Sequence, residues 1–251
     1  MSFKNLHQQN APLVICNVWD VASAKSAEKL NFKAIGTSSA AIATMLGYED
    51  GEQMNFAELV YIVKRILAST SLPLTVDIEA GFSRNPAEIA AHIKTLADLG
   101  VVGINIEDSI VSNERGLLNA NDFGKDLSEI KQQLVENEVN IFINVRTDPF
   151  LLGHANALAE AKQRIKLYES VAIDGIFVPC ITNEDDIRAV VNHTKLPVNV
   201  MCMPDLPDFT ALEKLNVKRI SMGNFIFDNL NGRFENTLGA IVESQSFNPV
   251  F

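Results

Sequence analysis

The sequence is poor in cysteine and contains no long apolar run. Its three cysteines, Cys16, Cys180 and Cys202, show no metal-ligand spacing, and such sparse use predicts a reduced, cytoplasmic setting. No run approaches the roughly 20 apolar residues of a membrane helix, and residues 1–10 lack the apolar core of a secretory signal. We therefore expect a soluble cytoplasmic protein that does not enter a membrane.

Basic residues are also scarce, since 21 Lys and Arg stand against 31 Asp and Glu for a formal net charge of −10. Such a field repels nucleic acids and anionic membrane surfaces, so neither is an expected partner. An anionic substrate must instead meet a local positive charge or a metal ion. The expected partner is therefore a small molecule held at one site.

What the sequence does contain is a regular alternation of short β-rich apolar runs with amphipathic helical stretches. Strands are expected at residues 13–16, 34–36, 74–77, 102–106, 141–145, 175–178, 198–200 and 219–221. Apolar residues recur at helical spacing most clearly in residues 21–30, 56–67, 86–99, 157–171 and 185–192. This order predicts repeated strand–helix units.

The length of 251 residues and a hydrophobic content of 47% suit one globular domain with a large core. Alternating strands and helices predict parallel pairing with right-handed crossovers, and eight such units close readily into a barrel. An open doubly wound sheet is the alternative, but it favours a glycine-rich phosphate loop, and no G-x-G-x-x-G or Walker A pattern occurs. We predict a single (β/α)8 TIM-barrel domain spanning residues 1–251.

Acidic residues gather where two neighbouring strands are expected to end. Asp77 and Glu79 follow one strand, and Glu107 and Asp108 follow the next. The carboxyl ends of barrel strands meet on one face, where uncompensated carboxylates would repel each other. Oxygen-only ligands of this kind favour Mg²⁺ or Mn²⁺, and no histidine cluster suggests zinc. The alternative is that these acids cap the helices that follow.

Two further strand ends carry groups that can bind an anion. Ser38 and Ser39 lie in a turn of small residues after the second strand, where hydroxyl and backbone N–H groups can hold a carboxylate or phosphoryl oxygen. A plain tight turn is the alternative. Arg146 ends the fifth strand and can bind a substrate carboxylate in bidentate fashion, or form a salt bridge with Asp148 or Glu107 instead.

These strand ends, taken in order, resemble the isocitrate lyase and phosphoenolpyruvate mutase superfamily. The similarity is to its short members, such as carboxyphosphonoenolpyruvate mutase, phosphonopyruvate hydrolase and oxaloacetate decarboxylase, and it covers roughly residues 13–223. The motifs that carry it are Asn17-Val18-Trp19-Asp20, Gly47-Tyr48-Glu49-Asp50, Asp77-Ile78-Glu79-Ala80-Gly81-Phe82, Ile106-Glu107-Asp108 and Asn144-Val145-Arg146-Thr147-Asp148. Glu79 stands where the second Asp of the family's metal-site run, Asp-x-Asp-x-Gly-Tyr, is commoner.

The resemblance implies roles for individual residues. Asp77 would lead a Mg²⁺ (or Mn²⁺) site, with Glu79 and Glu107 acting partly through water. Arg146 would contact the substrate, and Asp50 would approach the reacting centre. The remaining implied substrate-binding residues are Trp19, Ser38, Ser39, Ala40 and Asn199.

The chain also departs from the family. The Lys-Lys-Cys-Gly-His loop of the isocitrate and methylisocitrate lyases is absent, and the segment after the fourth-strand acids, residues 109–117, has Arg115 as its single cation. The mutase and phosphonopyruvate hydrolase branches place a lysine and an asparagine-bearing lid there.

The resemblance and these departures favour a Mg²⁺-dependent lyase, hydrolase or decarboxylase that acts on a small 2-oxo or 2-hydroxy carboxylate through an enolate stabilised by the metal. Two alternatives stay open: a mutase or hydrolase that acts on a phosphorus–carbon bond, and a protein that binds a keto acid without turning it over. Family members usually form tetramers that exchange the last helix. Residues 225–242 can form such a helix, so a homo-oligomer is expected.

Overall fold

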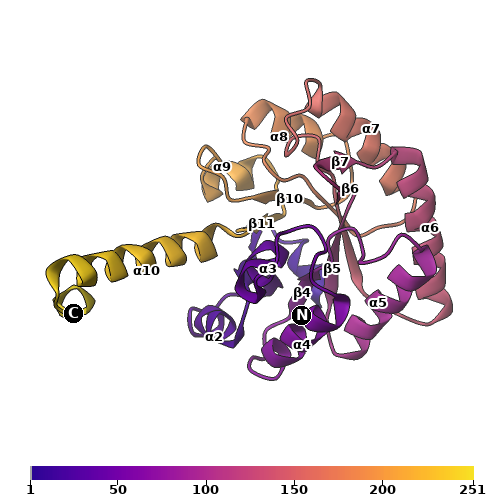
Figure 1. Ribbon diagram of the computed structural model, residues 1–251. Coiled ribbons are helices and arrows are strands. Elements are labelled where there is room, and N and C mark those ends of the chain that lie inside the picture. The colour runs from indigo at the N-terminus through magenta and orange to yellow at the C-terminus, as the bar shows by residue number, and fades with distance from the viewer. Residues whose placement is uncertain (1) are drawn as a thin grey trace.

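The computed structural model describes residues 2–251, and their main sheet is a closed parallel barrel (Figure 1). The strands pair in the order β1-β11-β10-β9-β8-β5-β4-β3-β2. β1 pairs with β11, and β2 pairs with β3. β1 and β2 are separated only at Ile15, so they are the two halves of one barrel strand. The strands are β1 Leu13–Val14, β2 Cys16–Val18, β3 Ile35–Thr37, β4 Leu74–Asp77, β5 Gly103–Glu107, β8 Phe142–Arg146, β9 Gly175–Phe177, β10 Val198–Met201 and β11 Arg219–Ser221.

Helices lie between the strands and surround the barrel (Figure 1). Local capping fixes where several begin: Asp20 with Ser23, and Asn55 with Glu58, form capping boxes, and Pro86 opens the next helix, where its missing N–H costs nothing. The helices are α1 Phe3–Leu6, α2 Val21–Lys29, α3 Ser39–Leu46, α4 Phe56–Leu67, α5 Pro86–Asp98, α6 Ala120–Glu136, α7 Ala157–Glu169, α8 Glu184–Val191, α9 Phe209–Lys214, α10 Phe225–Ser244 and the 3-10 turn η1 Asn248–Val250.

The predicted strands all form, shifted by at most two residues at either end, and the predicted (β/α)8 barrel is confirmed. One correction concerns residues 38–40. They were expected in a turn of small residues, but Ser38 is the N-cap of α3 and Ser39 its first residue. The small side chains allow a helix to start directly at the strand end. The segment after β5 is a two-stranded hairpin, β6 Ser109–Val111 and β7 Arg115–Leu117, that the sequence did not reveal.

The barrel interior is polar in its middle layer, in contrast to the apolar layer between strands and helices. Thr75, Asn105, Asn144, Asn199 and Arg219 come from β4, β5, β8, β10 and β11, and all are buried. Apolar residues fill the other side of the strands, where they meet the helices. The polar layer therefore lies between the amino ends of the strands and the face on which the candidate site is built.

Helix α1 closes the amino end of the barrel with an aromatic cluster. His7 stacks on Phe142 with ring centroids 4.3 Å apart, and Phe3 meets both rings edge-on. Burial and the positive charge of Arg219 lower the pKa of His7 to about 4, so this imidazole is neutral at pH 7. The cluster packs at the amino end of the barrel, opposite the face on which the candidate site is built.

The last long helix, α10, extends away from the barrel and carries the C-terminus at its far end (Figure 1). Of its 20 residues, all within the described range, Phe227 is the one that is buried. No helix in residues 2–251 has the length and apolar character needed to cross a lipid bilayer.

Candidate active site

A cavity of about 190 Å³ opens at the carboxyl ends of the barrel strands. Pockets for drug-sized ligands usually measure about 300–1,000 Å³, so this one suits a small molecule. Its walls combine carboxylates, guanidinium groups, hydroxyls and a few apolar side chains. The lining residues are Asn17, Ser38, Ser39, Ala40, Asp50, Asp77, Asn105, Arg115, Arg146, Leu151, Phe177, Pro179, Met201, Ser221, Gly223 and Asn224.

Asp77 ends β4 and is held by residues of the neighbouring strand end. Its carboxylate Oδ2 accepts a hydrogen bond of 2.8 Å from Ser39 Oγ, and its backbone N–H donates to Thr37 Oγ1, also at 2.8 Å. Ser39, as the first residue of α3, thus places its hydroxyl against Asp77, which was predicted to lead the metal site. Burial raises the pKa of Asp77, while the positive charge of Arg146 and the hydroxyl of Ser39 oppose that shift.

Glu79 and Glu107 are almost fully buried beside Asp77, each with 2% of its surface exposed. Burial raises the pKa of Glu79 to about 9, and the negative charges of Asp50 and Asp77 push it the same way. Burial likewise raises the pKa of Glu107 to about 8, although Arg146 and Arg115 oppose the shift. Asp77, Glu79 and Glu107 can therefore all be ionised at the same time only if further positive charge is added near them.

Glu79 also sits in an uncommon backbone conformation, with φ of 50°. Side chains other than glycine rarely adopt this left-handed region, and such residues cluster at functional sites. Its Oε2 accepts a 2.7 Å hydrogen bond from the Glu52 backbone N–H, which fixes the side chain under the loop that follows α3. The strained turn thereby brings the Glu79 carboxyl against the backbone of that loop, and Glu79 itself does not line the cavity.

Arg146, at the end of β8, engages two carboxylates at once. Its Nε donates to Asp148 Oδ1 at 2.7 Å and its Nη2 to Asp148 Oδ2 at 3.1 Å, while Nη1 lies 2.8 Å from Glu107 Oε2. Both salt bridges foreseen as alternatives to substrate binding are thus present. Because Arg146 also lines the cavity, its guanidinium is fixed there in one orientation by rigid anionic partners.

The β6–β7 hairpin brings a second guanidinium into the cavity. Arg115 forms salt bridges with Glu107 and, at 2.8 Å, with Asp50. It thereby ties the hairpin to the loop after α3 and places Asp50, predicted near the reacting centre, on the cavity wall. The sequence singled out Arg115 only as the lone cation of its segment, and nothing local predicted its partners.

Comparison with known proteins identifies the family. The family model of phosphoenolpyruvate phosphomutase matches residues 3–242. The chain belongs to this family. A curated relative, the uncharacterized protein MT2054 of Mycobacterium tuberculosis, is 34% identical over 89% of this chain and 82% of its own length. An oxaloacetate decarboxylase of Rhodopseudomonas palustris is 26% identical over 83% of this chain and 72% of its own length.

Solved structures agree with this phosphoenolpyruvate phosphomutase family assignment. A candidate phosphonomutase from Burkholderia cenocepacia J2315 is 33% identical with a TM-score of 0.86, covering 96% of this chain and 97% of that one. An oxaloacetate acetylhydrolase solved with the product oxalate is 16% identical, has a TM-score of 0.86 and covers 98% of this chain and 88% of its own; it shares the fold. The chain is accordingly an enzyme of this family, as the sequence predicted.

The carboxyl groups predicted as metal ligands fit a divalent cation in their chemistry. Asp77 Oδ1 and Glu79 Oε1 are buried and have no hydrogen-bond partner within residues 2–251, while Glu107 Oε2, also buried, lies 2.8 Å from Arg146 Nη1. Oxygen donors of this kind suit Mg²⁺ or Mn²⁺. They are not gathered into one ligand group, since no three Asp, Glu, His or Cys side chains of the described residues form one. Arg115 and Arg146 hold Glu107 from two sides instead.

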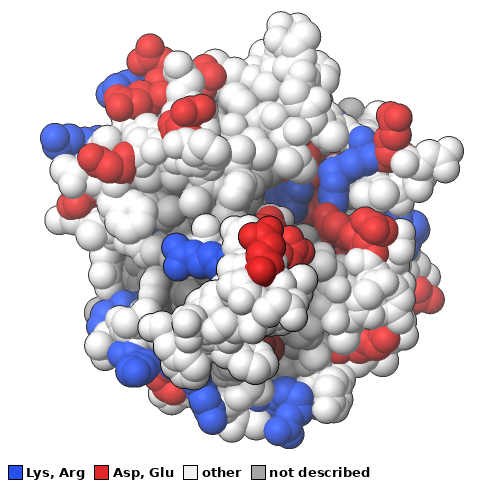
Figure 2. All heavy atoms as spheres, turned by 60° about the vertical axis from the view of Figure 1, so that its left-hand side comes forward, with Lys and Arg blue, Asp and Glu red and all other residues white. Residues whose placement is uncertain are grey.

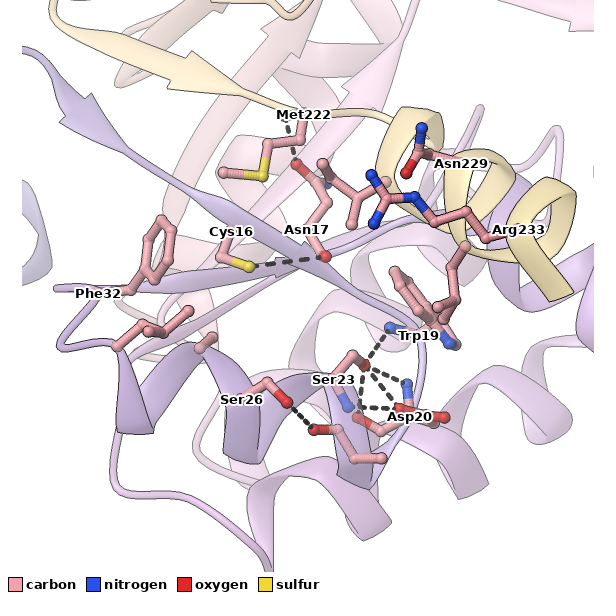
Figure 3. A pocket seen from close by; sticks show the side chains of 15 residues that line it. Cys16, Asn17, Trp19, Asp20, Ser23, Ser26, Phe32, Met222, Asn229 and Arg233 are labelled. Atoms are coloured by element: carbon pink, nitrogen blue, oxygen red, sulfur yellow. Dashed lines mark hydrogen bonds between the residues drawn. The ribbon is translucent and has the colours of Figure 1, made fainter. Parts of the chain in front are cut away.

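Two residues that the family resemblance implied as substrate ligands lie elsewhere. Trp19 is not on the cavity wall; it packs against Phe227 of α10, with ring centroids 5.1 Å apart, beside an apolar pocket between α2 and α10 (Figure 3). The chain turns outward after β2, because Asp20 caps α2 there. Asn199, 1% exposed, lies in the polar layer beneath the cavity. Ser38, Ser39 and Ala40 do line it.

Proposed function

We propose that this protein cleaves a carbon–carbon bond next to the carbonyl of a small 2-oxo carboxylate, as a lyase or decarboxylase that requires Mg²⁺ or Mn²⁺. The observation that carries this is a pair of buried carboxyl oxygens without hydrogen-bond partners, Asp77 Oδ1 and Glu79 Oε1. They lie near the carboxylate of Glu107 and near a cavity of about 190 Å³ that Asp77 and Arg146 line. The oxaloacetate decarboxylases among its relatives support a 2-oxo dicarboxylate as the first substrate to test.

The cavity residues have complementary tasks in this proposal. Arg146 binds a substrate carboxylate, and its bidentate pairing with Asp148 keeps the guanidinium from rotating away. The start of α3 offers the Ser38 to Ala40 segment to another anionic group of the substrate, because unpaired N–H groups and a positive partial charge lie at a helix N-terminus. These contacts would orient the bond to be broken toward Asp77 on the cavity wall.

Asp77, Glu79 and Glu107 would hold the divalent cation, which when bound would supply Lewis-acid stabilisation of negative charge developing on the substrate. Carboxyl groups outnumber guanidinium groups in this cluster, so it favours added positive charge. Arg115 would compete with the cation for Glu107, because its guanidinium already pairs with that carboxylate. If Arg115 gave way to the cation, Asp50 would lose its salt bridge with Arg115. Asp50, which lines the cavity, would then face the reacting centre.

The test is a calorimetric titration of oxalate into the metal-free protein and into protein with Mg²⁺. Oxalate mimics the planar anion that forms when such a bond breaks, and we expect it to bind at least about tenfold more tightly with Mg²⁺. Asp77→Ala should abolish the Mg²⁺ effect, because it removes a buried ligand oxygen. Asp98→Ala, which removes an exposed carboxylate paired with Lys94, should leave it intact. Oxalate binding that ignores Mg²⁺ contradicts the proposal.

A second candidate is cleavage or rearrangement of a phosphorus–carbon bond, favoured by the similarity to the Burkholderia candidate phosphonomutase. The two activities separate by product. A lyase or decarboxylase should form a keto acid from oxaloacetate with Mg²⁺ and leave phosphonopyruvate unchanged. Release of phosphate from phosphonopyruvate, or its conversion to phosphoenolpyruvate, would establish the second candidate instead.

We also propose that a second copy of this chain covers α10. Its residues Ile226, Leu230, Phe234, Leu238 and Val242, spaced by four, form one apolar stripe and are each 46–69% exposed. A pocket of about 520 Å³ between α2 and the base of the helix is lined largely by apolar side chains (Figure 3). On the face drawn in Figure 2, charged side chains of both signs are scattered among wide uncharged areas. An exposed apolar stripe of this length marks a protein interface.

Phe234→Glu should convert the assembly to a monomer of 27.6 kDa, measured by size-exclusion chromatography with light scattering. Burying a charge in an apolar interface costs more than the roughly 1.5–3 kcal/mol gained by burying the phenyl ring. Asn236→Glu is the matched control, because Asn236 is exposed and lies off the stripe, and the substitution adds the same charge. Wild-type protein that is already monomeric would contradict the assembly proposal.

A further inference from the structure

Arg219 is a buried cation without an anionic partner. It comes from β11, is 1% exposed, and forms no salt bridge with any residue in 2–251. Its Nη2 donates to Asn105 Oδ1 at 3.2 Å, while Nε and Nη1 have no hydrogen-bond partner. Burial lowers its pKa to about 9, so it still carries its charge at neutral pH. An unpaired buried charge destabilises a fold, so packing gives no reason for its presence.

The asparagine side chains next to Arg219 form a hydrogen-bond network in which the donor and the acceptor of each bond can be assigned in only one way. Asn199 Nδ2 donates to the Val200 carbonyl at 2.6 Å, and Asn144 Nδ2 donates to Asn199 Oδ1 at 3.2 Å and to Asn105 Oδ1 at 2.9 Å. A carbonyl can only accept and a guanidinium can only donate. The two ends of the network therefore fix the orientation of every amide between them.

This direction determines what Asn105 presents to the cavity. Its Oδ1 accepts from both Arg219 and Asn144, and its Nδ2 donates to no acceptor in the described residues. Asn105 lines the cavity beside Asp77 and Arg146. The free N–H groups of a cavity side chain whose rotamer is locked from below are suited to an anionic oxygen.

We propose that Asn105 binds the anionic substrate through Nδ2 and that Arg219 is a positioning residue, which locks this amide and adds a positive charge beneath the cavity. The inference rests on the proposed function in one respect, that the ligand is a small carboxylate. The charge of Arg219, which no salt bridge within residues 2–251 neutralises, favours a ligand in proportion to the ligand's negative charge, which no purely structural role would do.

Arg219→Met tests this with two ligands that differ in charge, oxalate with two carboxylates and oxamate with one, titrated calorimetrically in Mg²⁺. We expect oxalate affinity to fall about tenfold or more and oxamate affinity to fall less, since the Coulomb interaction scales with ligand charge. The Tm of Arg219→Met should equal or exceed that of the wild type, because an apolar side chain of similar volume replaces an unpaired charge. Arg219→Lys, which keeps the charge, should recover most of the oxalate affinity.

A buried but paired arginine is the matched control for stability. Arg164→Met should lower Tm, because it leaves Asp108 buried without its cation. Should Arg219→Met fail to fold, Asn105→Leu decides the question: loss of the donor should weaken both ligands about tenfold. Unchanged affinities in either folded variant, or equal losses for both ligands in Arg219→Met, overturn the inference. Wild-type protein that binds neither ligand overturns the proposed function as well.

Discussion

Replacing Arg146 with glutamine is expected to lower kcat/KM for keto-acid formation from oxaloacetate about a thousandfold. The side chain lines the cavity and is held by Glu107 and Asp148, so its charge is fixed where a substrate carboxylate would bind. Loss of one preorganised charged donor in a water-poor site typically costs about a hundredfold to a thousandfold. Here it also removes the cation that balances two buried carboxylates. Steady-state kinetics with Mg²⁺ measure the effect.

Arg146→Lys separates charge from geometry at this position. Lysine keeps the positive charge but cannot form the bidentate contact with Asp148, so we expect it to recover only part of the activity. Circular dichroism and thermal unfolding of both variants must show a folded barrel for the comparison to hold. Near wild-type kcat/KM in folded Arg146→Gln would show that the guanidinium is structural, with its two salt bridges as its whole role.

Arg164→Met is expected to lower the free energy of unfolding by about 3–5 kcal/mol, the usual cost of removing one partner from a buried ion pair. Asp108 is fully buried and accepts hydrogen bonds from Thr147 Oγ1, Tyr168 OH and the Asp148 backbone N–H as well as from Arg164 Nη1. Without Arg164 its negative charge has no cationic partner. Urea unfolding at pH 7 gives the measurement, provided the transition is two-state.

The control is Arg188→Met, which also removes a guanidinium next to carboxylates but at a half-exposed position on α8. Solvent-exposed ion pairs contribute about 0–1 kcal/mol, so this variant should unfold close to the wild type. Equal effects of the two substitutions would mean that the Asp108 network does not stabilise the barrel. This network also explains why Asp108 lies apart from the other acids: it is a structural residue that anchors the β5 end to α7.

Some residues of the candidate site could be predicted from the sequence and others could not. Asp77 and Arg146 were predicted from their positions at strand ends and Asp50 from the family resemblance, and all three line the cavity. Trp19 lies outside the cavity, since the direction of the chain after β2 depends on how α2 packs, which the motif itself does not encode. Nothing in the sequence indicated the roles we propose for Asn105 and Arg219, since an asparagine and an arginine inside short strands carry no local mark of their environment.

Local sequence pattern predicts the order of strands and helices, the barrel that they close into and the acidic residues at its carboxyl ends. These features follow from local periodicity, capping and the chain direction of parallel strands. Which charged side chains contact one another depends on the folded barrel. Arg115 reaches Asp50 from 65 residues away, and Arg219 reaches Asn105 from 114. Such contacts depend on barrel closure and strand register, which set the direction of each side chain once all strands are in place.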